Sequence, residues 1–237
     1  MLEIIATTVE DAKRIEASGA SRIELVSALA EGGLTPSYGL IKNVVESVKI
    51  PVNVMIRPHA KSFIYTNDEL NIMKEDILIA KHLKSNGVVL GVLDKNNTIC
   101  ENSLNKLLEI CEDIDVTFHR AIDELADPVN GIKVLAKYSQ INTVLTSGGK
   151  KDILDNLSII KQMIANAGAI RVLLGGGLNF KNINQIITET TAQEYHFGTA
   201  IRENNSSFGE INEEKLASLV KIVNQFRRGK EEHWGQV

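Results

Sequence analysis

Residues 116–123 read V-T-F-H-R-A-I-D. The alternation of polar and apolar residues over 115–118 predicts a β-strand. The apolar run then stops, and His119, Arg120 and Asp123 place a titratable base, a fixed cation and a carboxylate within five residues. A core strand does not need such an ending, whereas a catalytic or ligand-binding rim does. We therefore expect the carboxyl end of this strand to border a functional site.

Short apolar segments alternate with longer helical patterns along all 237 residues, without a linker rich in Gly, Ser or Pro. Their starts lie 20 to 36 residues apart, close to the roughly 30 residues of a βαβ unit. Eight such units in one domain, residues 1–237, predict an α/β fold, the (β/α)8 TIM barrel. An open doubly wound sheet is the alternative, but the Gly-x-Gly-x-x-Gly turn expected after its first strand is absent. The predicted strands cover residues 2–6, 22–26, 52–56, 88–92, 115–118, 143–145, 171–174 and 194–197.

The composition excludes several classes of protein. A net charge of −4 argues against nucleic-acid binding. The chain lacks a run of 18 apolar residues and a basic, apolar N-terminal signal. The two cysteines, Cys100 and Cys111, have no C-x-x-C partner and are expected to be reduced thiols. We therefore expect a cytoplasmic protein that binds neither nucleic acid nor a membrane.

Two charged residues stand near the carboxyl ends of the second and third strands. Glu24 lies between Ile23 and Leu25, so alternation turns it to the opposite face. A glutamate among the outer helices would be costly unless paired, which favours the barrel interior near its mouth. Arg57 follows the third strand. The two could serve a ligand together, or they could form a purely structural ion pair inside the barrel.

Two histidines are candidates for acid–base chemistry. His119 has an ordinary pKa near 6.5, so it could exchange a proton at cellular pH, with Glu24 or Asp123 as its partner. A core histidine bound to a backbone carbonyl is the alternative, but its neighbours Arg120 and Asp123 favour a functional role. His196 lies within the eighth strand. Alone it would be structural, yet a second histidine facing the same mouth favours a shared site.

Glycine-rich turns follow two strands. Gly175, Gly176 and Gly177 come after the seventh, where this fold often binds phosphate through backbone N–H groups. Ser147 and Gly148 follow the sixth and could add a second such loop. Arginine side chains could neutralise a bound anion. The alternative is that these glycines only permit tight turns.

No metal-binding pattern stands out in the sequence. Copper(I) favours thiolate and thioether ligands, but Cys100 and Cys111 fall on a predicted turn and helix that do not bring them side by side. His119, His196 and Glu24 could bind a harder metal, although their spacing does not demand one. The metal ligands are thus left unassigned.

Taken in order, these segments resemble the CutC family, which is named for copper homeostasis. The matching stretches are L-E-I at 2–4, R-I-E-L at 22–25, E-G-G-L-T-P-S at 31–37, M-I-R-P at 55–58, V-T-F-H-R-A-I-D at 116–123, L-T-S-G at 145–148, G-G at 175–176 and E-Y-H at 194–196. The resemblance implies a (β/α)8 barrel, a cytoplasmic homodimer or other small homo-oligomer, and a role in copper handling. Where many members carry cysteines, this chain has Ile5, Ala6 and Val26.

Two hypotheses follow. The resemblance implies a copper-homeostasis protein with copper as its ligand. The residues themselves indicate instead an enzyme that performs acid–base chemistry on a small anionic or phosphorylated substrate at the carboxyl-end mouth of the barrel. A barrel that binds a metabolite without catalysis is a third reading.

Overall fold

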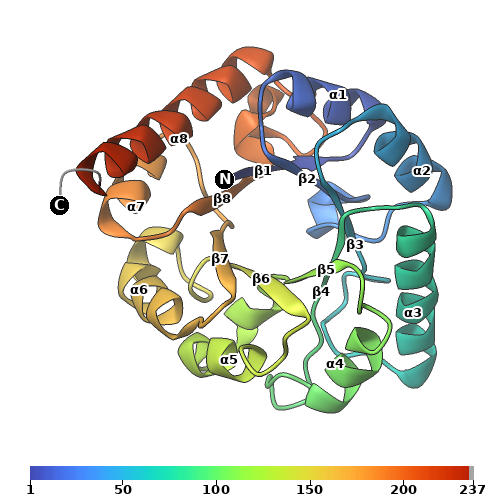
Figure 1. Cartoon of the computed structure of the whole chain (residues 1–237). Helices are drawn as coiled ribbons and strands as arrows, with labels where there is room; N and C mark the ends of the chain where they lie inside the picture. Colours follow the sequence, from blue (N-terminus) through green and yellow to red (C-terminus); the bar gives the residue numbers. More distant parts are fainter. Residues whose placement is uncertain (235–237) are drawn as a thin grey trace.

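The computed structural model describes the backbone of residues 1–234 and the side chains of residues 1–226. The described residues form a closed barrel of parallel strands, paired in sequence order, with an outer layer of helices (Figure 1). This confirms the predicted (β/α)8 barrel. The strands are β1 (Leu2–Ala6), β2 (Arg22–Leu25), β3 (Val52–Met55), β4 (Gly87–Leu90), β5 (Asp115–Phe118), β6 (Ile141–Thr146), β7 (Arg171–Leu174) and β8 (Glu194–Phe197). The helices are α1 (Val9–Ala17), α2 (Tyr38–Ser47), α3 (Asn67–His82), α4 (Glu101–Leu108), α5 (Pro128–Leu135), α6 (Leu157–Asn166), α7 (Ile183–Glu189) and α8 (Glu213–Trp234).

The strand ends differ from the predicted ones by at most two residues. At β2 the difference has a local cause, because Ser27 pairs with Leu34 and turns the chain away from the ladder. Helix starts follow capping chemistry: Thr66 and Glu69 form a capping box on α3, and Asp127 caps α5 ahead of Pro128. No helix among the described residues is both long enough and apolar enough to cross a membrane.

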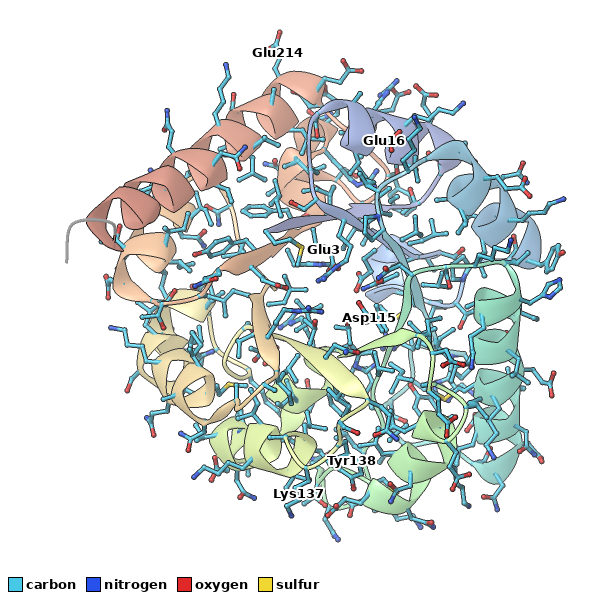
Figure 2. The ribbon with its side chains drawn as sticks, viewed as in Figure 1. Glu3, Glu16, Asp115, Lys137, Tyr138 and Glu214 are labelled. Carbon is cyan, nitrogen blue, oxygen red and sulfur yellow. The ribbon has the colours of Figure 1, made fainter. Side chains whose placement is uncertain are left out.

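Alternation along the strands separates two packing layers. Outward residues such as Ile4, Ile23 and Val54 join the large core beneath the helices. Inward residues form a much smaller apolar cluster, built from Ile5, Val26, Met55 and Val89. Buried polar residues of the strands, among them Glu3, Glu24 and His196, share the barrel with this cluster. Figure 2 shows Glu3 near the centre of the barrel, while Glu16 and Glu214 lie outside it.

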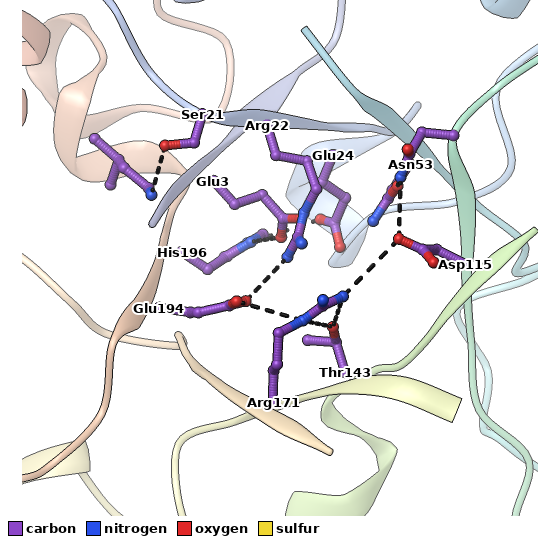
Figure 3. Close-up of polar contacts among 12 residues, drawn as sticks. Glu3, Ser21, Arg22, Glu24, Asn53, Asp115, Thr143, Arg171, Glu194 and His196 are labelled. Atoms are coloured by element: carbon purple, nitrogen blue, oxygen red, sulfur yellow. Dashed lines mark hydrogen bonds and ion pairs between the residues drawn. The ribbon is translucent and has the colours of Figure 1, made fainter. Parts of the chain in front are cut away.

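Charged residues close the amino-terminal end of the barrel. Arg22, Asp115, Arg171 and Glu194 are each the first residue of a strand. Arg171 lies 3.4 Å from Glu194 and 3.9 Å from Asp115, and Arg22 lies 3.6 Å from Glu194 (Figure 3). These ion pairs fill one end of the barrel, so the opening lies at the carboxyl ends of the strands.

Candidate functional site

A cavity of about 770 Å³ opens at the carboxyl ends of the strands. Its lining includes Glu24 and His196 from within the barrel, Arg57 and His119 after β3 and β5, and the loop after β7. Small-molecule sites of this fold lie at this face. The inward orientation predicted for Glu24 is confirmed by its burial and by its place on the cavity.

Glu24 and His196 form the buried acid–base pair of the cavity. His196 Nε2 lies 3.7 Å from Glu24 Oε2, and its Nδ1 lies 2.7 Å from Glu3 Oε1. Glu3 also forms an ion pair with Arg22 (Figure 3). Glu3 thus fixes the imidazole ring between two carboxylates, and Arg22 holds Glu3 in place.

The environment shifts the pKa values of Glu24, His196 and Glu3. Burial raises the pKa of Glu24 to about 7, although the positive field of His196 opposes the shift. Burial disfavours the imidazolium of His196, but the carboxylates of Glu24 and Glu3 outweigh it and raise the His196 pKa. The pKa of Glu3 is lowered, because Arg22 and His196 outweigh the effect of burial. Glu24 can therefore take up or release a proton near neutral pH, with the His196 imidazole beside it.

His119 has a different role from the one expected. Its Nδ1 accepts a hydrogen bond from the Ala121 N–H at 3.1 Å, so the ring proton belongs on Nε2. Burial, and next the positive charge of Arg57, lower the His119 pKa to about 3. His119 is thus a neutral N–H donor at cellular pH. The expected pairing of His119 with Asp123 is wrong, because Asp123 is bound elsewhere. The low pKa also disfavours uptake of a proton by His119 at cellular pH with either Asp123 or Glu24 as its partner.

Asp123 belongs to the scaffold that places Arg120. Its carboxylate accepts hydrogen bonds from Arg120 Nε at 2.8 Å and from Ser147 Oγ at 2.8 Å. Arg120 Nη2 also donates to Ser147 Oγ at 3.0 Å. Gly148 donates its N–H to Thr146. The hydroxyl and N–H of Ser147 and the N–H of Gly148 are thus hydrogen-bonded within the protein. Ser147 and Gly148 are therefore not the ligand-binding loop that the sequence predicted.

Arg57 is held by neutral groups. Its Nη1 donates to the carbonyl oxygens of Glu31 at 3.0 Å and Gly33 at 3.2 Å, and its guanidinium lies 4.9 Å from the centre of the Phe63 ring. No carboxylate among the described residues lies within ion-pair distance of it. The alternative of a structural Arg57–Glu24 pair is therefore wrong, and the Arg57 charge can act on a ligand.

The glycine turn after β7 brings its backbone against the Arg120 guanidinium. A Cβ on Gly176 would lie 2.5 Å from Arg120 Cζ, whereas a Cβ on Gly177 would meet open space. Gly176, Gly177, Arg120 and Lys181 all line the cavity. Gly175 packs instead against Leu145 and His196. The predicted anion loop therefore narrows to Gly176 and Gly177.

One group of residues has the spacing of a metal site. Single ligand atoms of Glu3, Glu24 and His196 lie within 4.8 Å of one another, and His119 is not part of this group. Glu3 is already committed to Arg22 and to His196 Nδ1. Only Glu24 and His196 Nε2 remain available, which is fewer than the three protein ligands of an ordinary catalytic zinc site.

The cysteines do not fit copper(I). Cys100 precedes α4 and its Sγ donates to Ser103 at 3.2 Å, whereas Cys111 follows the same helix and donates to the Leu107 carbonyl at 3.2 Å. Burial raises the pKa of the Cys111 thiol to about 11. Two thiols at opposite ends of a helix cannot share one ion, and a buried thiol with a raised pKa is a poor source of thiolate.

The profile of the CutC family matches residues 1–201. The chain belongs to this family. It is 41% identical over 197 residues to the human copper homeostasis protein cutC homolog, covering 83% of this chain and 72% of the human one. It is 37% identical over 196 residues to the family protein CutC of Pasteurella multocida, covering 82% and 80%.

Solved structures agree with this membership. A crystal structure described as the putative copper homeostasis protein CutC from Streptococcus agalactiae superposes with a TM-score of 0.79 at 35% identity, covering 85% of this chain and 99% of that one. Phosphoribosylanthranilate isomerase from Pyrococcus furiosus superposes with a TM-score of 0.61 at 14% identity, over 95% of this chain and 98% of that one. This second likeness shows the barrel fold alone. The CutC family thus extends over the β-strands that carry the cavity.

The sequence did not predict that Glu3 and Arg22 support the Glu24–His196 pair. Glu3 is in register with Arg22 on β2 and with His196 on β8, the two strands that pair with β1, and alternation alone could not set its height in the barrel. Lys181 and Phe63 were also missed, because each lies in a loop whose course the strand pattern does not determine.

His119 predicts a specific pH dependence of stability. Its pKa is about 3 in the folded chain and near 6.5 when unfolded, so the unfolded state binds more protons between these values. The contribution of the neutral His119 ring to the free energy of unfolding is fully present above pH 6.5 and is lost as the pH falls toward 3. Relative to His119→Asn, wild type should lose on the order of a few kcal/mol over this window in urea unfolding.

The exposed His82 on α3 supplies the control for that measurement. His82→Asn should follow wild type at every pH. A constant difference between wild type and His119→Asn from pH 7 to pH 4 would show that the ring takes up a proton without cost.

Proposed function

We propose that the protein serves copper homeostasis, as its curated relatives are named, through a barrel-mouth pocket that binds a small anionic ligand and performs acid–base chemistry. The names of relatives 41% and 33% identical to this chain support the copper role. The chemistry of the two cysteines speaks against direct thiolate binding of the ion. The pocket is therefore the better candidate for the molecular activity.

The observation that carries this proposal is the Glu24–His196 pair inside a cavity whose wall also holds Arg57 and Lys181, two cations without a carboxylate partner among the described residues. A buried carboxyl group with a pKa of about 7 is populated in both its forms at cellular pH, as a general acid or base requires. Arg57, Arg120 and Lys181 line the same cavity. Their field favours an anion and would hold it beside the pair.

The glycine turn gives a direct test of the anion pocket. Gly176→Ala should weaken binding of inorganic phosphate about tenfold, measured by calorimetry, because the added methyl group displaces Arg120. Gly19→Ala is the matched control, since Gly19 has nearly the same positive φ as Gly176 (84° and 85°) but does not line the cavity. Equal loss in both variants, or no phosphate binding by wild type, would sink the proposed pocket.

Copper binding itself is tested on the reduced protein. In competition with a chromophoric copper(I) chelator, we expect no tight site whose loss follows Cys100→Ser or Cys111→Ser, since the thiols do not converge. A site of one copper per chain that either substitution abolishes would instead show that this protein binds copper directly.

A cytoplasmic location and a small homo-oligomer remain predictions. The resemblance to the CutC family supports both. Light scattering on the purified chain checks the second, and a monomer at micromolar concentration would contradict it.

A further inference from the structure

We infer that the cavity is built for an anionic α-hydroxy-carbonyl compound, and that the chemistry is proton transfer at the carbon beside the carbonyl group. This inference deepens the proposed function and rests on it. It names the functional groups that the ligand must carry and gives His119 and Glu24 distinct roles in one reaction.

Three buried polar atoms of the cavity residues lack a hydrogen-bond partner among the described residues. They are Glu24 Oε1, His119 Nε2 and Arg57 Nε, from residues that are 2%, 3% and 8% exposed. Buried polar groups are almost always satisfied, so each orphaned atom of these cavity residues needs a partner, which a ligand or a water supplies. Glu24 Oε1 accepts or delivers a proton, whereas His119 Nε2 can only donate a hydrogen bond. A matching ligand presents an acidic hydrogen to one and an oxygen to the other.

The structure fixes His119 as a donor. The Ala121 N–H occupies Nδ1, and the Phe63 ring packs with its centre 4.8 Å from that of the imidazole. A Cβ on Gly91 would fall 2.5 Å from Nδ1, so the glycine lets the ring sit against β4. The remaining nitrogen, Nε2, is held rigidly with its hydrogen. A fixed neutral N–H stabilises the oxyanion that develops from a carbonyl group and keeps its own proton.

Glu24 completes the reaction. Its carboxylate removes the proton from the carbon next to the carbonyl group, and the electrons of the broken C–H bond form the C=C bond. The carbonyl oxygen becomes an enolate oxygen, which accepts a hydrogen bond from the Nε2–H of His119. Once a hydroxyl proton has moved between the two oxygens, the Glu24 carboxylic acid returns its proton to the neighbouring carbon. Atoms and electrons balance without an oxidant, so the step is an isomerisation.

The charges around the cavity specify the rest of the ligand. Arg57 stands beside Phe63 and exerts a positive field on His119, and it has no carboxylate partner among the described residues. A cation at this place favours a negatively charged enolate as well as an anionic substituent. The ligand class is therefore a small hydroxy aldehyde or ketone that carries a phosphate or carboxylate group.

Calorimetry with two probes tests the inference. Phosphoglycolohydroxamate, a phosphate-bearing analogue of an enediolate, should bind wild type at least about 100-fold more tightly than inorganic phosphate, as expected of an intermediate analogue. His119→Asn keeps an acceptor for Ala121 but loses the distal N–H, so this preference, measured as the ratio of the two dissociation constants, should fall to a few-fold. His119→Gln restores a distal donor and should recover part of it.

The outcomes separate the inference from the proposed function. Phosphate binding without a preference for the hydroxamate would overturn the inference and leave the anion pocket standing. Binding of neither probe would overturn both. If the variants do not fold, ¹⁵N NMR of wild-type His119 decides: a hydrogen on Nε2 at pH 7 is expected, and an imidazolium or a hydrogen on Nδ1 would refute the assigned role.

Discussion

Replacement of Glu3 by alanine should lower the free energy of unfolding by about 3–5 kcal/mol, because it leaves a buried arginine without its main partner. Glu3 is fully buried, forms an ion pair with Arg22 and binds His196. The remaining partner of Arg22, Glu194, lies 3.6 Å away and is shared with Arg171. Urea unfolding at pH 7 measures the loss.

Glu46→Ala is the control for this substitution. Glu46 is exposed on α2, and removing a surface carboxylate of this kind changes stability by about 0.5 kcal/mol or less. If Glu3→Ala cost no more than Glu46→Ala, the polar interior would not depend on Glu3, and His196 would lack the support that we assign to it.

Glu24→Gln should make the protein more stable at alkaline pH. The pKa of Glu24 is about 7 when folded and near 4.5 when unfolded, so the native state binds more protons between these values. Wild type therefore loses stability as pH rises from 4.5 to 7, by about 3 kcal/mol. Glutamine is neutral throughout, so the variant should resemble wild type at pH 4.5 and exceed it by that amount at pH 8.

The higher free energy of unfolding of Glu24→Gln at pH 8 would measure how much the buried Glu24 carboxylate destabilises the wild-type protein. Glu31→Gln, on the exposed rim of the same cavity, should show no such divergence. Proton transfer should disappear in Glu24→Gln, since an amide cannot act as the base. Parallel stability curves for wild type and Glu24→Gln would mean that Glu24 ionises as it does in water.

The sequence predicted the barrel because eight apolar runs at the spacing of βαβ units leave few other folds. It also predicted the direction of Glu24, since alternation between Ile23 and Leu25 depends only on strand geometry. The partners of Arg57 could not be predicted, because they are backbone carbonyls of the loop that holds Glu31 and Gly33. Contacts of this kind leave no pattern in residue types.

The roles of His119 and Ser147 were misjudged for a related reason. The charge state of His119 depends on burial and on the nearby Arg57, which come from tertiary structure. Ser147 looked like part of a ligand loop, yet Asp123, 24 residues away, takes its hydroxyl and its N–H. Sequence locates the rim of this barrel, but the hydrogen-bond partners decide which rim residues remain free for a ligand.

A crystal structure of the protein with bound inorganic phosphate would test the central claim most directly. We predict an anion in the barrel mouth that contacts Arg120 and the backbone of Gly176 or Gly177, on the same cavity as Glu24 and His196. A mouth that holds only water at a phosphate concentration that saturates binding in solution would contradict the anion pocket.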